Sequence, residues 1–357
     1  MLNLYSIRPK GFNIGNDVIY VGINHFIRQA FKSSYNVISL PATSKYESQK
    51  KSGLSAQTVH ELNQFADGLI IGGGNLYENG ELEVDATAIK ALSKPFMIFS
   101  VSRGRIYNPN LELVDRTDVM PDDKIRLLNQ YSSFSLSRDI GTYNYLKGIG
   151  VDTIVGGCPT LFINEIPQHN VPIMDADKTD ALISIRTPTL MNIPVEYQYG
   201  LRETLQRLIE LLKKYGYKNC KFLCHDHRDI PFAASFRNID YIYTEDVYTY
   251  LTYLRNTRLN LTFRLHSFLP CLSYGTPTIK ISYDERALSM VDTIGLTQWN
   301  INLVKDDVLV EVENRIKNIA ELSIIKSSQS ETWQKLRNTM LESTTEFAHS
   351  VLEKKLK

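Results

Sequence analysis

The sequence has few cysteines, almost no net charge and no long apolar run. Its four cysteines are scattered, so we expect the reduced thiols of a cytosolic protein and no disulfide framework. The net charge of +1 argues against nucleic acid as the main partner, because domains that bind nucleic acid are usually clearly basic. No run approaches the roughly 18 apolar residues of a membrane span. The first residues, MLNLYSIRPKGFN, lack the apolar core of a signal peptide.

Two common nucleotide-binding motifs are also missing. Nothing matches GxGxxG or GxxxxGK[ST], so the sequence indicates neither a Rossmann dinucleotide site nor a P-loop. A glycine run that includes Gly73 and Gly74, followed by Asn75, ends an apolar segment that is typical of a buried strand. The run is either a tight crossover or part of a cleft floor, since α/β proteins bind ligands at the carboxyl ends of their strands.

Residue types that bind metals gather at Cys224-His225-Asp226-His227. A structural zinc site needs a second, separated pair of ligands, and the sequence has no CxxC partner for this cluster. We therefore expect no metal, and we favour a contact from an acidic or imidazole side chain at the mouth of a cleft.

The chain is long and apolar enough for about two domains, with 357 residues of which 43% are hydrophobic and 22% charged. Signals for strands and helices alternate over residues 2–155 and again from residue 181. After the first strand we expect a turn over residues 10–16 and a helix that starts at residue 17, and we expect a later strand over residues 96–101. This alternation is typical of parallel sheets that helices cover on both faces. Residues 164–178 contain two prolines and little periodicity, which predicts a linker.

The predicted fold class is therefore α/β, with two Rossmann-like domains that face each other across a cleft. We expect an N-terminal domain over residues 1–170 and a C-terminal domain over residues 179–325. Residues 326–357 are helical in pattern and have no strand to follow, so we expect a C-terminal helix that packs back across both domains.

Two junctions between a predicted strand and a predicted helix carry candidate site residues. The junction within residues 259–296 holds Arg264 and His266. Free N–H groups and the dipole of a helix start favour anions, so a fixed cation and an imidazole there suggest an anion site with an acid or base beside it. A basic surface turn is the alternative. An earlier junction holds Asn13 and Asn16, which can bind a hydroxyl or cap the helix.

Two more arginines follow predicted strands. Arg138 precedes Asp139, and the two side chains either pair with each other or reach the cleft. Arg186 ends the first strand of the second half, where a lone arginine is well placed to bind an anion.

The order and spacing of several segments resemble the polysaccharide pyruvyl transferase family from Asn13 to Leu296. These segments are NIGND, GLIIGGGNLYE, KPFMIFSVSRGR, LSRDIGTYNYL, GGCPTLF, SIR and RLHSFLPCLSYGTPTIKISYDERA. Two positions depart from the pattern. Relatives often have Gly-Asp where this chain has Gly15-Asn16-Asp17, and they often have lysine where it has Arg286. Both departures concern the contacts to the acceptor more than the fold.

The resemblance implies a fold like that of GT-B glycosyltransferases, phosphoenolpyruvate as donor substrate without a further cofactor, and a sugar as acceptor. The product would be a pyruvate ketal that bridges two hydroxyls of one sugar in a cell-surface polysaccharide or its precursor. By similarity, Arg264 and His266 match the arginine and histidine of the family's donor site.

The chemistry of this reaction fits the candidate residues. His266 can shuttle protons near neutral pH, and Arg264 can hold the phosphate, while Arg186 or Arg138 binds the carboxylate. Asp226 and Asp139 are candidates for activating the acceptor hydroxyl. We expect the remaining substrate contacts from six more residues: Asn13, Asn16, Gly73, Gly74, Asn75 and Ser267.

Two alternatives remain at this point. One is a GT-B glycosyltransferase with a nucleotide-sugar donor, and the other is a non-catalytic member that binds glycans. The acceptor is free, nucleotide-linked or lipid-linked, and a lipid-linked acceptor would bring this cytoplasmic protein to the inner face of the membrane as a peripheral protein. The sequence leaves the acceptor sugar and the oligomeric state open.

Overall fold

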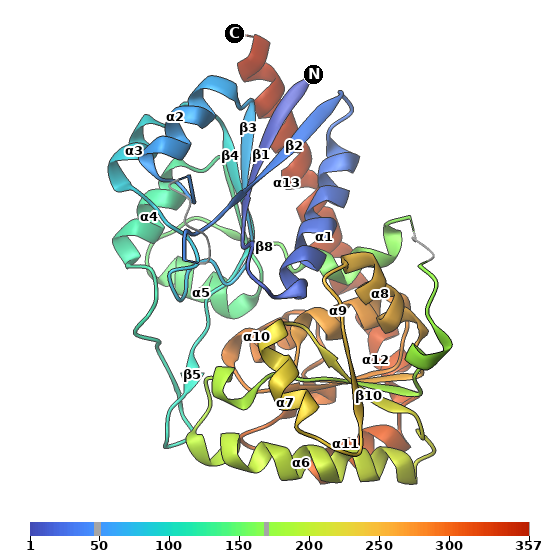
Figure 1. Cartoon of the computed structure of the whole chain (residues 1–357). Coiled ribbons are helices and arrows are strands. Elements are labelled where there is room, and N and C mark those ends of the chain that lie inside the picture. Colours follow the sequence, from blue (N-terminus) through green and yellow to red (C-terminus); the bar gives the residue numbers. More distant parts are fainter. Residues whose placement is uncertain (46–50, 168–170, 357) are drawn as a thin grey trace.

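The computed structural model describes residues 1–45, 51–167 and 171–356. Each half of the chain contains a parallel six-stranded sheet with helices on both faces (Figure 1). The strand orders are β2-β1-β3-β4-β7-β8 and β11-β10-β9-β12-β13-β14. We call the first sheet with its helices the N-terminal half, and the second the C-terminal half. The predicted α/β architecture of two Rossmann-like units is confirmed.

The bounds of the elements follow the predicted alternation. The N-terminal half contains β1 (Leu2–Arg8), α1 (Ile14–Ala30), β2 (Tyr35–Pro41), α2 (Ala56–Phe65), β3 (Gly68–Gly74), α3 (Ala86–Ala91), β4 (Phe96–Val101), β5 (Ile106–Tyr107), β6 (Leu113–Val114), α4 (Asp122–Tyr131), β7 (Phe134–Ser137), α5 (Ile140–Gly148) and β8 (Ile154–Val155). The C-terminal half contains β9 (Ala181–Ser184), α6 (Val195–Lys214), β10 (Cys220–Cys224), α7 (Ile230–Ala234), β11 (Asp240–Tyr243), α8 (Val247–Asn256), β12 (Leu259–Thr262), α9 (Leu265–Tyr274), β13 (Thr278–Ser282), α10 (Glu285–Thr293), β14 (Ile301–Asn302), α11 (Val308–Lys317) and α12 (Glu321–Ser328).

The central strands are buried on both faces, which explains their continuous apolar sequences. β3 and β4 are buried along their whole lengths, as are β12 and β13 in the other half. Because all strands of a sheet run in the same direction, the loops that follow them gather at one edge. These edges of the two sheets face each other and form the site described below.

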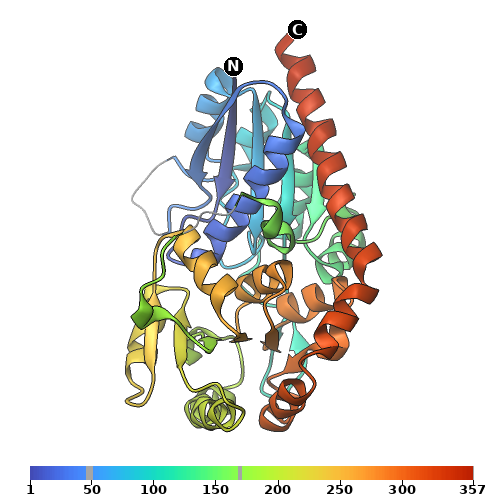
Figure 2. The ribbon, with the colours of Figure 1, turned by 90° about the vertical axis from the view of Figure 1, so that its right-hand side faces the viewer.

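The C-terminal helix α13 (Ser330–Leu356) runs along both halves (Figure 2). Near its start, the Trp333 indole donates a hydrogen bond to the Ile294 carbonyl at 2.9 Å, in the C-terminal half. Further along, Phe347 packs against Phe31 beside the N-terminal sheet, with 6.1 Å between ring centroids. Apolar residues of both halves and of α13 belong to one contiguous core cluster. The helix therefore ties the halves together.

The region between the halves contains only short helical turns among its described residues. The segment predicted as a linker includes the end of one 3₁₀ helix, Pro159–Glu165, and a second one, Asp175–Asp177. Residues 168–170 of this segment, and residue 357 of the predicted C-terminal helix, lie outside the described part of the chain. No helix of the described residues is long and apolar enough to cross a membrane.

Candidate functional site

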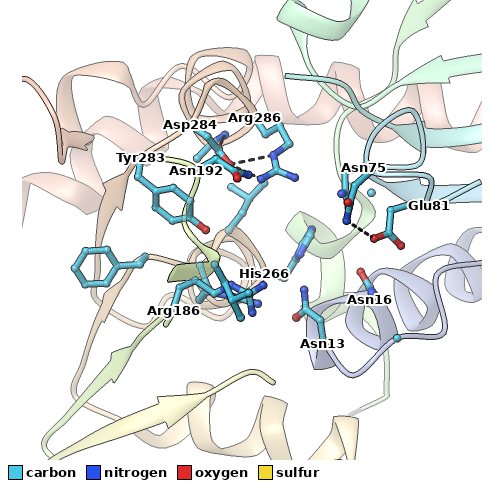
Figure 3. Close-up of a pocket in the computed structure, with 18 of the residues that line it drawn as sticks. Asn13, Asn16, Asn75, Glu81, Arg186, Asn192, His266, Tyr283, Asp284 and Arg286 are labelled. Atoms are coloured by element: carbon cyan, nitrogen blue, oxygen red, sulfur yellow. Dashed lines mark hydrogen bonds and ion pairs between the residues drawn. The ribbon is translucent and has the colours of Figure 1, made fainter. Parts of the chain in front are cut away.

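A cavity of ≈ 380 Å³ lies where the carboxyl ends of the two sheets face each other (Figure 3). The loops after β1 and β3 form its wall on the side of the N-terminal half. The loops after β9, β12 and β13 form the opposite wall. Eight of the residues predicted for the site line it: Asn13, Asn16, Gly74, Asn75, Arg138, Arg186, Arg264 and His266.

The backbone N–H groups in the first turn of α1 are already hydrogen-bonded within the protein. Asn13 caps this helix, with its side-chain oxygen 3.1 Å from the Gly15 amide. The Ile14 amide donates to the His225 carbonyl at 2.9 Å, which joins α1 to the other half. The predicted turn over residues 10–16 is therefore too long, because α1 begins at Ile14. These amides are occupied, so this helix start offers side chains rather than N–H groups to the cavity.

The start of α9 differs from that of α1. Arg264 is its N-cap residue, and its amide is held by the Thr262 hydroxyl at 2.8 Å. The backbone N–H groups of Leu265 and His266 have no hydrogen-bond partner among the described residues. Both residues line the cavity. This helix start therefore presents unused donors and its positive dipole end to the cavity, as an anion site requires.

Two arginines stand side by side on this wall. Arg264 is 7% exposed, and its nearest carboxylate oxygen is Oδ2 of Asp229, at 4.0 Å. Arg186 lies 3.6 Å from Asp229 Oδ1 and 3.4 Å from Asp226 Oδ2. Burial and the neighbouring Arg264 charge lower the pKa of Arg186. Two cations that repel each other in a buried place are stabilised by an anion between them.

Most oxygens of the nearby carboxylates accept hydrogen bonds from other donors. Asp226 accepts the Arg228 guanidinium and amide at 2.9 and 3.0 Å. Asp229 Oδ1 accepts the Thr187 amide at 2.9 Å, while Asp229 Oδ2 is buried without a hydrogen bond within the described residues. The guanidinium of Arg264 also has no hydrogen-bond partner in the described part of the chain. The wall thus carries cationic donors that the described residues do not satisfy.

His266 lies between this wall and the first turn of α1 (Figure 3). A Cβ atom at Gly15 would sit 3.0 Å from its Nδ1 atom, tighter than an ordinary contact, so glycine helps the ring lie close to this turn. Neither ring nitrogen has a hydrogen-bond partner among the described residues, and Nε2 is buried. Burial, together with the charges of Arg138 and Arg264, holds the pKa of His266 well below its usual range. The imidazole is therefore neutral at pH 7, the form that can accept a proton.

Four other predicted site residues do not line the cavity. Asp139 caps α5 through the Thr142 amide at 2.9 Å and pairs with Arg138 at 3.2 Å, which is the simpler of its two predicted roles. Ser267 is buried and bonds the Ser184 hydroxyl at 2.8 Å. Gly73 is buried within β3. These three residues shape the walls without reaching the cavity.

The fourth of these residues is Asp226, which lies behind the arginines. Burial opposes its ionisation, but hydrogen bonds from Arg228 outweigh this effect and lower the pKa of Asp226 to about 2. A carboxylate with so low a pKa, already bonded to an arginine, is a weak base. The geometry gives Asp226 the task of orienting Arg228 and Arg186. Among the described residues there is no group of three or more His, Cys, Asp or Glu side chains that could hold a metal ion.

Several lining residues were missed by the sequence prediction. The most relevant are Glu81, Asn192, Tyr283, Asp284 and Arg286 (Figure 3). The last three belong to the segment SYDERA, in which Arg286 was named as a departure from the family pattern, but none of the three was predicted as a site residue. Its position directly after a predicted strand was the signal that could have identified them, because strand ends form the sites of α/β proteins.

A buried ion pair joins the two halves beside the cavity. Arg286, at the start of α10, lies 3.0 Å from Glu78 Oε2 in the loop after β3 and also bonds Asp284 at 3.0 Å. Glu78 is 1% exposed and accepts the Gly104 amide at 2.6 Å. A Cβ atom at Gly104 would lie 2.5 Å from Arg286 Cγ, so glycine is required for this contact. The pair links the loop after β3 to the start of α10.

We expect Arg286→Met to destabilise the protein by about 3–5 kcal/mol, because it leaves the Glu78 carboxylate buried without its main partner. Urea unfolding of the variant and the wild type measures this difference. The double variant Glu78→Gln/Arg286→Met removes the unpaired charge and should recover much of the loss. A single variant within about 1 kcal/mol of the wild type would show that the pair does not hold the halves together.

Comparisons with known proteins agree with this architecture. A putative UDP-N-acetylglucosamine 2-epimerase from Listeria monocytogenes has 9% identity and a TM-score of 0.58, with 92% of this chain and 91% of that chain covered. UDP-GlcNAc 2-epimerase from Neisseria meningitidis, bound to UDP-GlcNAc, has 12% identity, a TM-score of 0.55 and 99% coverage of both chains. At such identities the likeness shows the fold alone, and it confirms the predicted GT-B-like arrangement.

The family is shown by the sequence itself. No curated protein matches the chain in a sequence comparison. A family model does match: it describes polysaccharide pyruvyl transferase, and it covers residues 13–285, which is most of the chain and includes both walls of the cavity. The chain therefore belongs to the polysaccharide pyruvyl transferase family.

Proposed function

We propose that this protein transfers pyruvate from phosphoenolpyruvate to two hydroxyls of one sugar, in a cell-surface polysaccharide or its precursor. The observation that carries the proposal is the unsatisfied cationic wall around Arg264 and the start of α9, with a neutral imidazole beside it. Family membership supports the general class of reaction.

The donor suits the charge of the cavity. Phosphoenolpyruvate carries a phosphate and a carboxylate, and each needs charge-assisted hydrogen bonds. Arg264 and the free N–H groups of Leu265 and His266 supply donors for the phosphate. Arg186 or Arg138, which also line the cavity, supply a cation for the carboxylate. No further cofactor is required in this scheme, since the guanidinium groups offset the charge of the leaving phosphate.

The reaction balances with the groups available. A base removes the proton of the first sugar hydroxyl, the oxygen bonds to C2 of the donor, and the methylene carbon C3 gains a proton to become a methyl group. The C2–O bond to phosphate then breaks, the second hydroxyl bonds to C2, and its proton leaves with the phosphate. His266 is the group that we assign to accept and deliver these protons, because neither of its ring nitrogens is bonded to a described residue.

The acceptor faces the other wall. Asn13, Asn16, Asn75 and Glu81 line this side, and amide and carboxylate groups are suited to hydroxyls rather than anions. We therefore assign the sugar to the N-terminal half. A lipid-linked sugar would bring the protein to the inner face of the membrane.

Release of phosphate from phosphoenolpyruvate tests the proposal. The assay uses a panel of sugars with free neighbouring hydroxyls, and NMR of the product detects the methyl group of the ketal. Release that depends on one acceptor, with formation of the ketal, is expected. Release of a nucleotide from a nucleotide sugar, with no release of phosphate, would assign the cavity to glycosyl transfer instead.

We also expect donor binding to take up a proton. The Arg138 and Arg264 charges contribute to the low pKa of His266, and a bound anion offsets those charges, so the pKa rises in the complex. Affinity should then fall as the pH rises from the lower pKa of the free site through the higher pKa of the complex. Calorimetric titrations in buffers of different ionisation enthalpy measure the uptake.

His266→Gln is the control for this uptake, because the donor titrates in the same range and glutamine does not titrate. We expect the variant to show a smaller uptake than the wild type. Equal uptake in both proteins would mean that the imidazole does not change its protonation on binding.

A further inference from the structure

Tyr283 lies between β13 and the Asp284 cap of α10, and the activity proposed above has not used it. Its ring stands on the wall of the C-terminal half, and its hydroxyl is turned into the cavity (Figure 3). Within the described residues this hydroxyl has no hydrogen-bond partner. A phenol that faces a polar cavity without a protein partner is available to a ligand.

Hydrogen bonds of the two neighbouring residues hold the chain on both sides of Tyr283. The preceding residue, Ser282, accepts the Leu303 amide at 2.8 Å, and Asp284 accepts the Ala287 amide at 3.0 Å. The ammonium of the buried Lys280 lies 5.9 Å from the centre of the ring. The chain on both sides of Tyr283 is therefore held by hydrogen bonds, so less ordering is needed when a ligand binds.

The charges around Tyr283 are mainly positive. Burial and the neighbouring Asp284 raise the pKa of the phenol, while Arg264, Arg186 and Arg286 oppose this rise. The phenol therefore keeps its proton at neutral pH and is a donor. All three arginines line the cavity with Tyr283, so this wall favours the negative charge of a ligand.

We propose that the Tyr283 hydroxyl donates a hydrogen bond to the phosphate of the donor substrate, and that it is a further catalytic residue; this inference rests on the proposed function. With C3 of the donor at His266 and the sugar on the N-terminal half, as assigned above, the phosphate would lie against the wall that carries Tyr283. The hydroxyl transfers no proton. Its hydrogen bond strengthens as charge collects on the phosphate during cleavage of the C2–O bond.

Tyr283→Phe tests this role, because it keeps the ring and removes only the oxygen. The probes are inorganic phosphate and pyruvate, which carry one anionic group of the donor each, and the readout is the thermal shift of the full chain. We expect the apparent Kd for phosphate to rise about tenfold, as for the loss of one hydrogen bond to a charged group. The shift with pyruvate should not change.

Tyr253→Phe is the matched control, since its hydroxyl bonds Asp177 at 3.2 Å and does not line the cavity. Phosphate should stabilise this variant as it does the wild type. Equal stabilisation of Tyr283→Phe, or no stabilisation of the wild type by phosphate, would overturn the proposal. This readout needs no turnover, so it separates a wrong role for Tyr283 from a wrong reaction.

In an active enzyme, Tyr283→Phe should affect kcat more than KM. We expect kcat with phosphoenolpyruvate to fall about 10- to 100-fold, because the bond strengthens in the transition state. The KM should rise by no more than the tenfold expected for phosphate, because the same bond is weaker in the ground state. A change in KM alone would make Tyr283 a residue that only binds the ground state.

Discussion

His266→Ala lowers turnover by about 10²- to 10⁴-fold in our account, because it removes the group that moves protons between the sugar and C3 of the donor. The fold should survive, since neither ring nitrogen of His266 bonds a described residue. Initial rates of phosphate release, together with the melting temperature, measure both effects. The expected result is a protein that binds the donor and hardly turns it over.

His227→Ala is the control for this experiment. This histidine is more exposed, its ring packs on Phe12 with 4.4 Å between ring centroids, and it does not line the cavity. Its replacement should leave turnover within a factor of a few. Near-normal turnover of His266→Ala would remove the imidazole from the mechanism, while loss of turnover in both variants would indicate a structural effect.

The second large effect that we expect is the loss of donor binding in Arg264→Ala. We expect the affinity for phosphoenolpyruvate to fall about 100-fold, because a buried cationic donor to the phosphate is lost. Arg264→Lys keeps the charge but loses the planar fork, so its affinity should fall about tenfold. Isothermal titration with phosphoenolpyruvate measures both variants.

Arg258→Ala is the matched control for the arginine variants. Arg258 lies on the surface of the C-terminal half, where it pairs with Asp180 at 3.0 Å and is not part of the cavity. The Arg258→Ala variant should bind phosphoenolpyruvate with the affinity of the wild type. Unchanged affinity in Arg264→Ala would mean that the phosphate is held elsewhere on the wall.

Much of the fold could be predicted because its signals are local. Buried parallel strands have continuous apolar sequences, as in residues 96–101, where prediction and structure coincide. The start of α1 was placed at residue 17, and the helix begins at Ile14. Its first turn contains glycine and asparagine, which are typical of turns, and Asn13 stabilises it as a cap.

The site could be predicted only in part, because its geometry depends on contacts between distant residues. Arg264 and His266 were found since they follow an apolar strand and begin a helix. Asp226 bonds Arg228 two residues on, and Asp139 caps a helix through Thr142 three residues on. The sequence does not decide between these local contacts and a place in the cavity, so it left both carboxylates as candidates. The pairing of Glu78 with Arg286, 208 positions apart, likewise needs the structure.

The most direct test of the central claim compares ligands by thermal shift. Phosphoenolpyruvate and a panel of nucleotide sugars are added to the wild type and to Arg264→Ala. A ligand at 100 times its Kd stabilises the folded protein by about 2.7 kcal/mol, which is well within measurement. We predict stabilisation of the wild type by phosphoenolpyruvate and not by the nucleotide sugars, with loss of the effect in Arg264→Ala. Stabilisation by a nucleotide sugar instead would contradict the account. It would indicate that the donor is a nucleotide sugar, as in a glycosyltransferase.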